Sequence, residues 1–241
     1  MIIIFAIDAL EYDKVKEFDC KNLMQKHFGK TDISEFSQPR TMVLWSSFMT
    51  GQNKEKELLA KGDEEMWNTK IPLEETFFSK FNNPAVIDLP GFNYEKEQHE
   101  TERKMLEGFF NEKDKGKKME IRKKFNDLCF KHHRKIKKDF FQALEEEEKH
   151  DFVLGYFSVA DVIGHLNFGN RTMMKIIYKE LNEVAGRIKD KGKLIILSDH
   201  GMKGLGMFGE HSEYGFWSTN FETDLKNPKI TDFYEFIVGL K

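Results

Sequence analysis

Short runs of apolar residues, many of them β-branched, alternate along the chain with stretches whose apolar residues recur every three or four positions. The runs are typical of buried strands and the stretches of amphipathic helices. Strands separated by helices in this way predict an α/β fold, in which helices cover both faces of a mostly parallel central sheet. We expect five strands, the last of them the weakest: Ile2–Ile7, Ala85–Leu89, Phe152–Phe157, Leu194–Ser198 and Tyr214–Trp217.

Three helices are indicated by signals at their ends. Thr41–Met49 is a short predicted helix ended by Gly51, and Pro72–Phe81 is a predicted helix with proline in its first turn. Asn170 is the expected N-cap of a third helix. The apolar residues of that helix form one stripe that we expect to face the sheet: Met173, Ile177, Leu181, Val184 and Ile188.

Residues 94–148 differ from the rest, because Lys and Glu are dense there and the apolar residues are confined to a helical stripe. We interpret this segment as a helical insertion within a single domain of residues 1–241, since no internal repeat and no Pro/Gly/Ser linker divides the chain. Gly116 separates a helix around Glu95–Phe110 from a longer one. The two helices either pack flat on the core, which we favour, or form a hairpin that caps a site. The stripe of the longer helix is Ile121, Phe125, Leu128, His132, Ile136, Phe140 and Leu144.

Composition excludes several classes of protein. The 241 residues include 38 basic and 41 acidic side chains, so the formal net charge of −3 gives no sign of a surface that binds nucleic acid. Only 39% of residues are hydrophobic and no run is long enough to span a membrane. The apolar start lacks a basic leader, so we expect a cytoplasmic protein. The two cysteines, Cys20 and Cys129, form no disulfide or metal framework. No feature predicts an oligomeric state.

Acids and histidines gather where predicted strands end. Asp8 follows the first strand directly, Asp161 comes shortly after Phe152–Phe157, and Asp199 and His200 end the fourth strand. The carboxyl ends of parallel strands lie at one edge of a sheet, so we expect these carboxylates to converge. Carboxylates held together repel one another unless cations lie between them.

His165 and His211 fall in the same part of the chain. Carboxylates and neutral imidazoles together suit zinc or a similar divalent metal. Of the other histidines, we expect His132 to be a hydrogen-bonded packing residue. The remaining four stand in polar surroundings and we expect them to be exposed: His27, His99, His133 and His150.

Five stretches resemble the alkaline phosphatase superfamily, and within it the type I phosphodiesterase and nucleotide pyrophosphatase family. In chain order they read IIIFAID, RTMVLWSSFMTG, DVIGHLNFG, LSDHGM and GEHSEYG. They lie in residues 1–51 and 155–215 and leave out the expected insertion. The pair formed by DxxGHxxG and SDHG is the specific part. The resemblance implies an alkaline phosphatase-like fold and a metal-dependent phosphohydrolase that acts on a small phosphate ester or a nucleotide.

The resemblance also implies a site with two divalent metal ions, zinc or else manganese. One metal would be held by Asp161, His165 and His211. The other would be held by Asp8, Asp199 and His200, with the Thr41 hydroxyl completing it. Thr41 would be the nucleophile, since it stands nine residues before Thr50 as the family spacing requires. Ser46 and Ser47 are competing hydroxyls deeper in the helix.

The position of Thr41 suits this role on physical grounds as well. Thr41 opens a predicted helix, where free N–H groups and the helix dipole favour a phosphate oxygen. Met42, through its backbone N–H, Arg40 and Asn167 are candidate donors to that phosphate. Trp45 lies one turn beyond Thr41, where it either stacks on a base or aryl leaving group or is a core residue.

Three alternatives to a phosphodiesterase remain open at this stage. A phosphomonoesterase differs in the groups that bind the additional phosphate oxygens. A phosphomutase of the same superfamily shares the metal ligands but usually carries a larger closing domain. A noncatalytic metal-binding protein of the same fold is the third alternative. It is suggested by the compact size and by Leu44, which stands where the phosphodiesterase family commonly has an asparagine that assists the phosphate. A sulfatase is disfavoured because neither cysteine lies in a CxPxR-like context.

Overall fold

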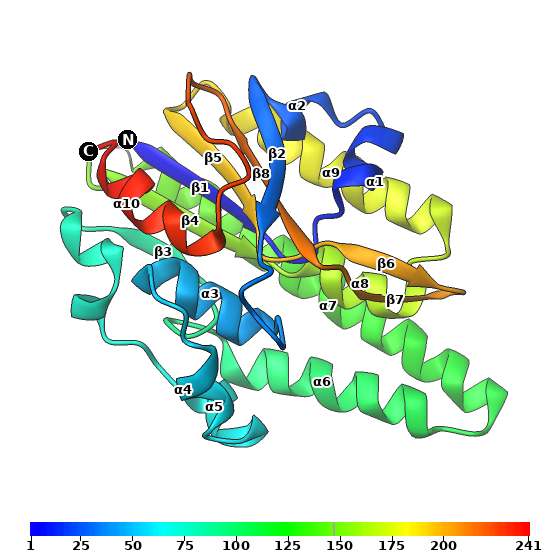
Figure 1. The fold of residues 1–241 in the computed structure, drawn as a ribbon. Coiled ribbons are helices and arrows are strands. Elements are labelled where there is room, and N and C mark those ends of the chain that lie inside the picture. Colours follow the sequence, from blue (N-terminus) through cyan, green and yellow to red (C-terminus); the bar gives the residue numbers. More distant parts are fainter. Residues whose placement is uncertain (147) are drawn as a thin grey trace.

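The computed structural model describes residues 1–146 and 148–241. Its centre is a six-stranded sheet with the order β2-β8-β5-β1-β4-β3 (Figure 1). β1 pairs in parallel with β4 and β5, and β3 pairs in parallel with β4. β8 runs antiparallel to β5, and β2 antiparallel to β8. The predicted α/β class with a mostly parallel sheet is confirmed. The strands are β1 (Ile2–Ile7), β2 (His27–Asp32), β3 (Ala85–Ile87), β4 (Phe152–Phe157), β5 (Lys193–Ser198) and β8 (Tyr214–Thr219).

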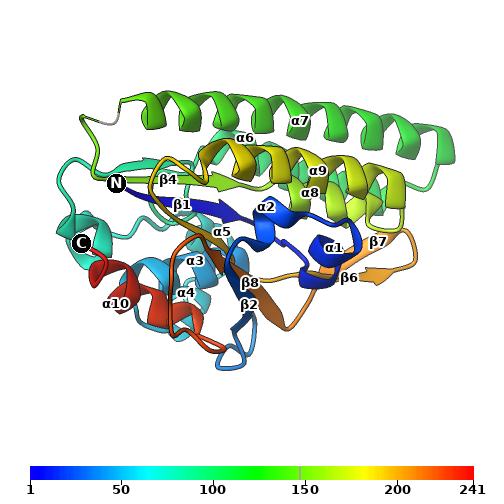
Figure 2. The same ribbon diagram turned by 90° about the horizontal axis from the view of Figure 1, so that it is seen from above.

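Helices cover both faces of this sheet (Figure 2). The helices that pack on one face are α1 (Tyr12–Glu17), α2 (Lys21–Met24), α6 (Lys96–Asn111), α7 (Lys115–Glu145), α8 (Val159–Asn167) and α9 (Arg171–Ile188). Those on the other are α3 (Thr41–Thr50), α4 (Glu55–Leu59), α5 (Asp63–Asn68), α10 (Phe233–Val238) and the 3₁₀ helices η1 (Leu73–Glu75), η2 (Phe77–Lys80) and η3 (Ile230–Asp232).

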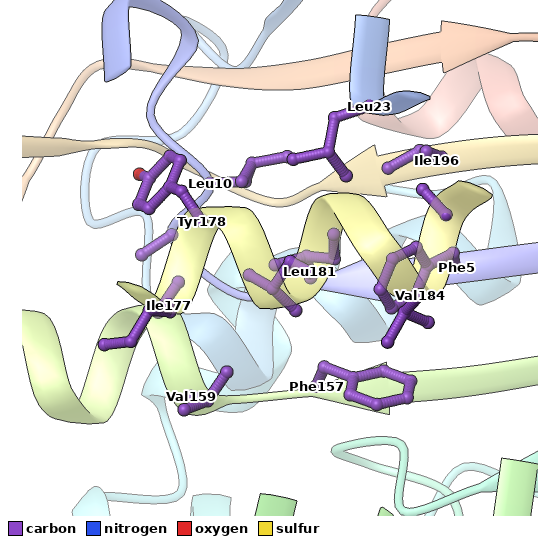
Figure 3. Close-up of a cluster of buried hydrophobic side chains, with 14 of the residues drawn as sticks. Phe5, Leu10, Leu23, Phe157, Val159, Ile177, Tyr178, Leu181, Val184 and Ile196 are labelled. Carbon is purple, nitrogen blue, oxygen red and sulfur yellow. The ribbon is translucent and has the colours of Figure 1, made fainter. Parts of the chain in front are cut away.

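β1 divides the interior into two cores. Alternate side chains of a strand point to opposite faces, so Ile3 and Phe5 pack in one core while Ile2 and Ile4 pack in the other. Every residue of β1 and of β4 is buried, as continuous apolar runs predict for strands covered on both faces. Figure 3 shows the first core, in which the apolar stripe of α9 lies against residues of β1, β4 and β5.

The end signals of two helices are confirmed. Gly51 ends α3 with a left-handed φ of 67°, a conformation that glycine adopts without strain. The Asn170 side chain accepts a hydrogen bond from the Met173 N–H at 3.1 Å and so caps α9. The predicted stripe of α9 is buried except at Met173, which is partly buried.

The predicted helix at Pro72–Phe81 is wrong, because the segment folds as η1 and η2 with extended Thr76 between them. The Thr76 hydroxyl donates to the Leu73 carbonyl at 2.8 Å and closes the first turn. Phe77 and Phe78 are adjacent and both fully buried, each against Phe152. A single amphipathic α-helix on the surface points successive side chains about 100° apart, so it does not bury two neighbouring phenylalanines equally.

Three strands were not predicted. β2 is an edge strand that pairs with β8 on one side only, and its sequence is therefore more polar than that of the central strands. The other two, β6 (Met202–Leu205) and β7 (Phe208–His211), form a separate antiparallel hairpin rich in glycine. Glycine lowers strand propensity, so this hairpin gives no strand signal in the sequence.

The segment predicted as a helical insertion forms α6 and α7, which lie side by side (Figures 1 and 2). Gly116 lies within the first turn of α7, and the break falls at residues 112–114 instead. α7 packs along β4. Most of the predicted stripe is buried, but Ile121 and Leu128 are only partly so, and Cys129 and His133 are buried in addition to it. No helix in the described part of the chain is both long and apolar enough to cross a membrane.

The contact between α7 and the sheet depends on Phe140 and Gly155. The Phe140 ring lies over Gly155 of β4, where an added Cβ would come within 2.6 Å of it, and it also packs on Phe5 and Phe157. Phe140 is fully buried. This ring therefore fixes the long helix to the centre of the sheet.

We predict that Phe140→Ala lowers the free energy of unfolding by about 3 to 5 kcal/mol, since it leaves a cavity under α7. Met119→Ala on the same helix is the control, because Met119 is 59% exposed and its loss is expected to cost less than about 0.5 kcal/mol. Urea denaturation followed by circular dichroism measures both. Equal effects of the two substitutions would show that α7 does not depend on this contact.

Candidate metal centre

Three carboxylates meet at the carboxyl edge of the sheet. Asp8 directly follows β1, Asp199 directly follows β5, and Asp161 lies in the first turn of α8 after β4. β1 lies between β4 and β5 and pairs with both in parallel, so the three strand ends are neighbours. All three side chains are buried. The topology therefore brings together residues that are separated by up to 191 positions in the chain.

One candidate ligand group consists of Asp161, His165 and His211. Asp161 and His165 are four residues apart on α8, so they share a face of the helix. Nε2 of His165 lies 3.2 Å, and Nε2 of His211 3.4 Å, from Oδ1 of Asp161. Nδ1 of His165 is 3.2 Å from the Gly209 carbonyl, which directs Nε2 toward the carboxylate.

The β6–β7 hairpin, in which His211 is the last residue of β7, lies beside α8 (Figure 1). Met202 of β6 pairs with His211 of β7, and its side chain packs into the space left by Gly164 and Gly209. An added Cβ at either glycine would lie within 2.4 Å of the Met202 sulfur, so neither position accepts a larger residue without movement. The glycines near His211 thus allow the hairpin to approach α8 closely.

A second candidate group consists of Asp8, Asp199 and His200. Nε2 of His200 lies 3.3 Å from Oδ1 of Asp8 and 3.5 Å from Oδ2 of Asp199. Its Nδ1 faces the Gly201 carbonyl at 3.0 Å, which again leaves Nε2 for the carboxylates. The His200 ring stacks on that of His211 at 3.7 Å between centroids, so the two groups are in contact.

The electrostatics of the second group favour a bound cation. Burial, and next the Asp161 carboxylate, raise the pKa of Asp8 to about 7. Burial followed by Asp8 raises the pKa of Asp199 well above its ordinary value. Burial lowers the pKa of His200 to about 3, which keeps its imidazole neutral. The protein thus holds these carboxylates where ionisation is costly without a compensating positive charge.

Buried atoms without hydrogen-bond partners point to the same conclusion. Oδ1 of Asp8, Oδ1 of Asp161, Oδ2 of Asp199 and Nε2 of His200 are buried and have none. Buried polar atoms are normally satisfied, so a converging set of orphaned acceptors needs an explanation. Carboxylate oxygens and imidazole nitrogens are the ligands that zinc and related divalent metals take. The residues present therefore fit two divalent cations.

Thr41 lies next to the second group. It is the first residue of α3, and its hydroxyl donates to Oδ2 of Asp8 at 3.4 Å. Tyr156 of β4 donates a further hydrogen bond from its hydroxyl to the same oxygen. Asp8 Oδ2 is thus oriented by two hydroxyls, while Oδ1 remains free for a cation.

A family model described as type I phosphodiesterase/nucleotide pyrophosphatase matches residues 3–214. The chain belongs to this family. A similar solved structure is that of murine ectonucleotide pyrophosphatase/phosphodiesterase 5, with 14% sequence identity and a TM-score of 0.41. The match covers 84% of this chain and 57% of that structure, so this chain spans little more than half of its length. No curated protein matches the sequence significantly. The resemblance inferred from the five stretches is confirmed.

A cavity of about 210 Å³ opens beside the ligand groups of this family member. One wall holds Asp8, Thr41 and the first ligand group, and the opposite wall is formed by the helices α5, α6 and α7 and the loop before α6. α6 therefore lines the cavity while α7 packs on the sheet. The opposite wall contributes Trp67, Tyr94, His99, Glu102, Arg103, Leu106 and Phe125.

The structure brings some predicted substrate-binding residues to the site and not others. Arg40 is the residue before α3 and forms an ion pair with Asp63 at the surface. Met42 is buried in the first turn of α3, where backbone N–H groups have no partner within the helix. Trp45 is fully buried and packs edge-on against Phe48 and Tyr156, so it does not reach the cavity. The core alternative is correct for this residue.

Asn167 is also directed away from the cavity. Its side-chain oxygen accepts two hydrogen bonds from Arg122, at 3.0 and 2.6 Å, and its amide donates to the Ile163 carbonyl and to Asn126. Asn167 therefore joins α8 to α7 and is not a phosphate donor here. Its place at the end of α8, next to the ligand motif, is what made it a candidate.

Several residues at the site were missed in the sequence. His99 and His133 were expected to be exposed but are buried, and His133 contacts Glu180 at 2.6 Å. His27 and His150 are partly exposed. Tyr156, Tyr94 and Arg103 carry no local signal, because a tyrosine in a strand or an arginine in a charged helix is ordinary. The density of aromatics before the expected insertion is the one available hint.

We predict that His165→Ala lowers the metal content of the reconstituted protein by about one divalent ion per chain, because Asp161 and His211 alone hold an ion weakly. His27→Ala is the control. His27 pairs with Glu222 at the surface and belongs to none of the candidate ligand groups, so its substitution is expected to leave the metal content unchanged. Inductively coupled plasma mass spectrometry after gel filtration measures both. An unchanged content in His165→Ala would remove this residue from the ligand set.

Proposed function

We propose that the chain is a metal-dependent phosphodiesterase of the nucleotide pyrophosphatase type, acting through a covalent intermediate on Thr41. The observation that carries this proposal is the position of the Thr41 hydroxyl. It lies at the start of α3, 3.4 Å from a carboxylate of the second ligand group, on the wall of the cavity that also exposes the first group. The family membership supports the same class of reaction.

The start of α3 suits the binding of a phosphate. The first backbone N–H groups of a helix have no partner within it, and the helix dipole adds partial positive charge. A phosphate placed next to Thr41 would receive these donors, including the N–H of Met42, while its phosphorus faces the hydroxyl oxygen. The remaining candidate donor, Arg40, is held by Asp63 and would have to leave that ion pair.

Two divalent cations, zinc or else manganese, would lower the pKa of the Thr41 hydroxyl and neutralise charge on the reacting phosphate. The chain itself orients the nucleophile. Asp8 Oδ2 accepts the Thr41 hydroxyl hydrogen bond, and Tyr156 on the other side fixes this carboxylate. The oxygen of Thr41 is thereby held in one position at the cavity wall, which favours in-line attack.

The proposed reaction has two steps. In the first, the Thr41 hydroxyl gives up its proton to water, Oγ1 forms a bond to phosphorus, and the bond from phosphorus to the leaving oxygen breaks, with its electron pair going to that oxygen. In the second, a water oxygen attacks phosphorus, the bond to Oγ1 breaks, and Thr41 recovers a proton. Each displacement inverts the configuration, so the configuration at phosphorus is retained overall.

The cavity supports a small ester with an aromatic or nucleoside group. Trp67 and Tyr94 stack at 6.0 Å between centroids, and the Arg103 guanidinium lies 4.2 Å from the Trp67 ring centre. Such a wall offers stacking surfaces and one cation to a substrate. These residues take the role first considered for Trp45. The cytoplasmic location stays a prediction from the sequence.

We predict that Thr41→Ala lowers the hydrolysis of bis-p-nitrophenyl phosphate in the presence of zinc or manganese by at least about 10³-fold, because the nucleophile is lost. Thr50→Ala at the other end of α3 is the matched control. Its hydroxyl only donates within the chain, to the Ser46 and Gln52 carbonyls, so near-normal activity is expected. Turnover of the diester by Thr41→Ala at the normal rate would refute the role of Thr41.

The same assay separates the alternatives. A wild-type protein that hydrolyses p-nitrophenyl phosphate but not the diester would be a phosphomonoesterase. Transfer of phosphate within a sugar phosphate would indicate a phosphomutase. Absence of turnover on diesters, monoesters and phosphonates would favour a noncatalytic metal-binding protein of this fold.

We further predict that enzyme quenched in acid during turnover of bis-p-nitrophenyl phosphate carries a p-nitrophenyl phosphoryl group on the peptide containing Thr41. A diester that is chiral at phosphorus should give a product of retained configuration, because two inversions cancel. Mass spectrometry of the digested protein and ³¹P analysis of the product measure these outcomes. Net inversion would exclude the covalent step even if the enzyme is active.

A further inference from the structure

A third cluster of metal-ligand side chains lies beside the same cavity, which two of its members, His99 and Glu102, line. Asp88 follows β3, His99 and Glu102 lie on α6, and His132 lies on α7. All four are buried, with no more than 5% of any of them exposed. None belongs to the two ligand groups described above, and the family resemblance assigned none of them a role.

The two imidazoles are oriented in the same way. Nε2 of His99 and Nε2 of His132 lie 2.8 and 3.1 Å from the same atom, Oδ2 of Asp88. Their Nδ1 atoms both face Glu102, at 2.9 and 3.6 Å. One carboxylate thus faces both Nε2 atoms, and the other faces both Nδ1 atoms.

This arrangement is the usual one around metal-binding histidines. A ligating histidine donates its second ring N–H to a carboxylate or carbonyl, which fixes the ring and its tautomer. Glu102 occupies that position for His99, as the carbonyls of Gly209 and Gly201 do for His165 and His200, and it lies 3.6 Å from the same atom of His132. The three remaining ligand atoms, from Asp88, His99 and His132, lie within 4.8 Å of one another.

An unpartnered atom points into the cluster. Nε2 of His132 is buried and has no hydrogen-bond partner despite its short distance to Asp88, so its geometry does not suit a hydrogen bond. Nε2 of His200 is orphaned in the same way in the second ligand group. A nitrogen lone pair that points into such a cluster can bind a cation there, although no hydrogen-bond donor faces it.

The backbone and a neighbouring ring hold the cluster in place. Asp88 has a left-handed φ of 58°, and its Oδ1 accepts a hydrogen bond from the Glu95 N–H at 2.8 Å, so Oδ2 is the oxygen left for the imidazoles. The Tyr94 ring stacks on His99 at 3.9 Å with an angle of 6° between the planes. The ligand atoms are therefore preorganised by contacts outside the cluster.

We propose that Asp88, His99 and His132 bind a third divalent transition-metal ion, with Glu102 orienting both histidines. Two carboxylates and two neutral imidazoles carry a charge of −2, which one divalent ion neutralises in this buried place. Nitrogen and oxygen ligands of this kind suit zinc. Because the ligands come from the end of β3, from α6 and from α7, the ion joins both long helices to the sheet. This site is independent of the proposed function.

The main competing interpretation is an ion-paired cluster without metal, in which both imidazoles are protonated between the two carboxylates. It has the same net charge as the metal site, and the two differ in whether a metal is bound. Metal counting therefore distinguishes them without reference to turnover.

The experiment uses the full chain reconstituted with zinc and freed of excess metal by gel filtration. Inductively coupled plasma mass spectrometry should find three ions per chain, one for each ligand group. Asp88→Asn, which keeps the size of the side chain, should bind one ion fewer. Asp151→Asn is the control at an acid outside the three groups, and it should bind as many as the wild type.

A second variant locates the ion. Asp161→Asn combined with Asp199→Asn disables the two other groups and should retain one cobalt ion, with the visible absorption of nitrogen and oxygen coordination. Wild-type protein that saturates at two ions overturns the proposal, as does a metal content unchanged in Asp88→Asn. If these variants do not fold, native mass spectrometry of the wild type titrated with zinc decides alone, since a third ion supports the site and saturation at two refutes it.

Discussion

The main physical constraint on this structure is the repulsion among three buried carboxylates, which the fold has to hold together. Asp8, Asp161 and Asp199 lie together because β1 is flanked in parallel by β4 and β5, and the sheet allows them no other place. In an uncharged interior such a set is costly, and the orphaned oxygens of all three show that hydrogen bonds do not relieve the cost. Divalent cations at the two candidate ligand groups would relieve this cost. The apolar packing on both faces of the sheet holds the carboxylates in place against this repulsion.

The terminal parts of the chain and its middle contribute different parts of the site. The terminal parts supply the sheet edge, the start of α3 and the β6–β7 hairpin, and with them every ligand of the first two groups. The middle supplies α6 and α7, which close the cavity from the other side. α7 is attached through Phe140 on β4, whereas α6 contacts the core mainly through its own partner helix. The part of the cavity lining that α6 contributes is thus carried by the less strongly anchored of the two helices.

Most of the sheet could be predicted from local signals in the sequence, which also indicated that strand-end carboxylates converge. The division into two candidate ligand groups came from the family resemblance. β1 and β4 are continuous apolar runs, and Asp8, Asp199 and His200 stand directly at strand ends. The predictions failed where tertiary contacts decide the structure. The hairpin that carries His211 is formed by glycines that leave room for Met202, which no propensity expresses. Trp45 and Asn167 lie close to the motifs in sequence, but one side chain is in the core and the other is hydrogen-bonded to α7. The burial of His99 could not be foreseen, because its partners Asp88 and Glu102 look like ordinary surface acids.

The contact of Met202 with Gly164 and Gly209 has a chemical consequence. The thioether packs into the space left by the two glycines, where an added Cβ would lie within 2.4 Å of the sulfur, and only 2% of the residue is exposed. Conversion of this sulfur to the sulfoxide would add a polar oxygen in that gap and force the hairpin away from α8. His211 would then move away from Asp161 although neither residue had been altered. A peroxide that reached the sulfur during a brief opening of the hairpin would thus disrupt the candidate metal centre without altering any of its ligands, and a methionine sulfoxide reductase would be needed to reverse the change.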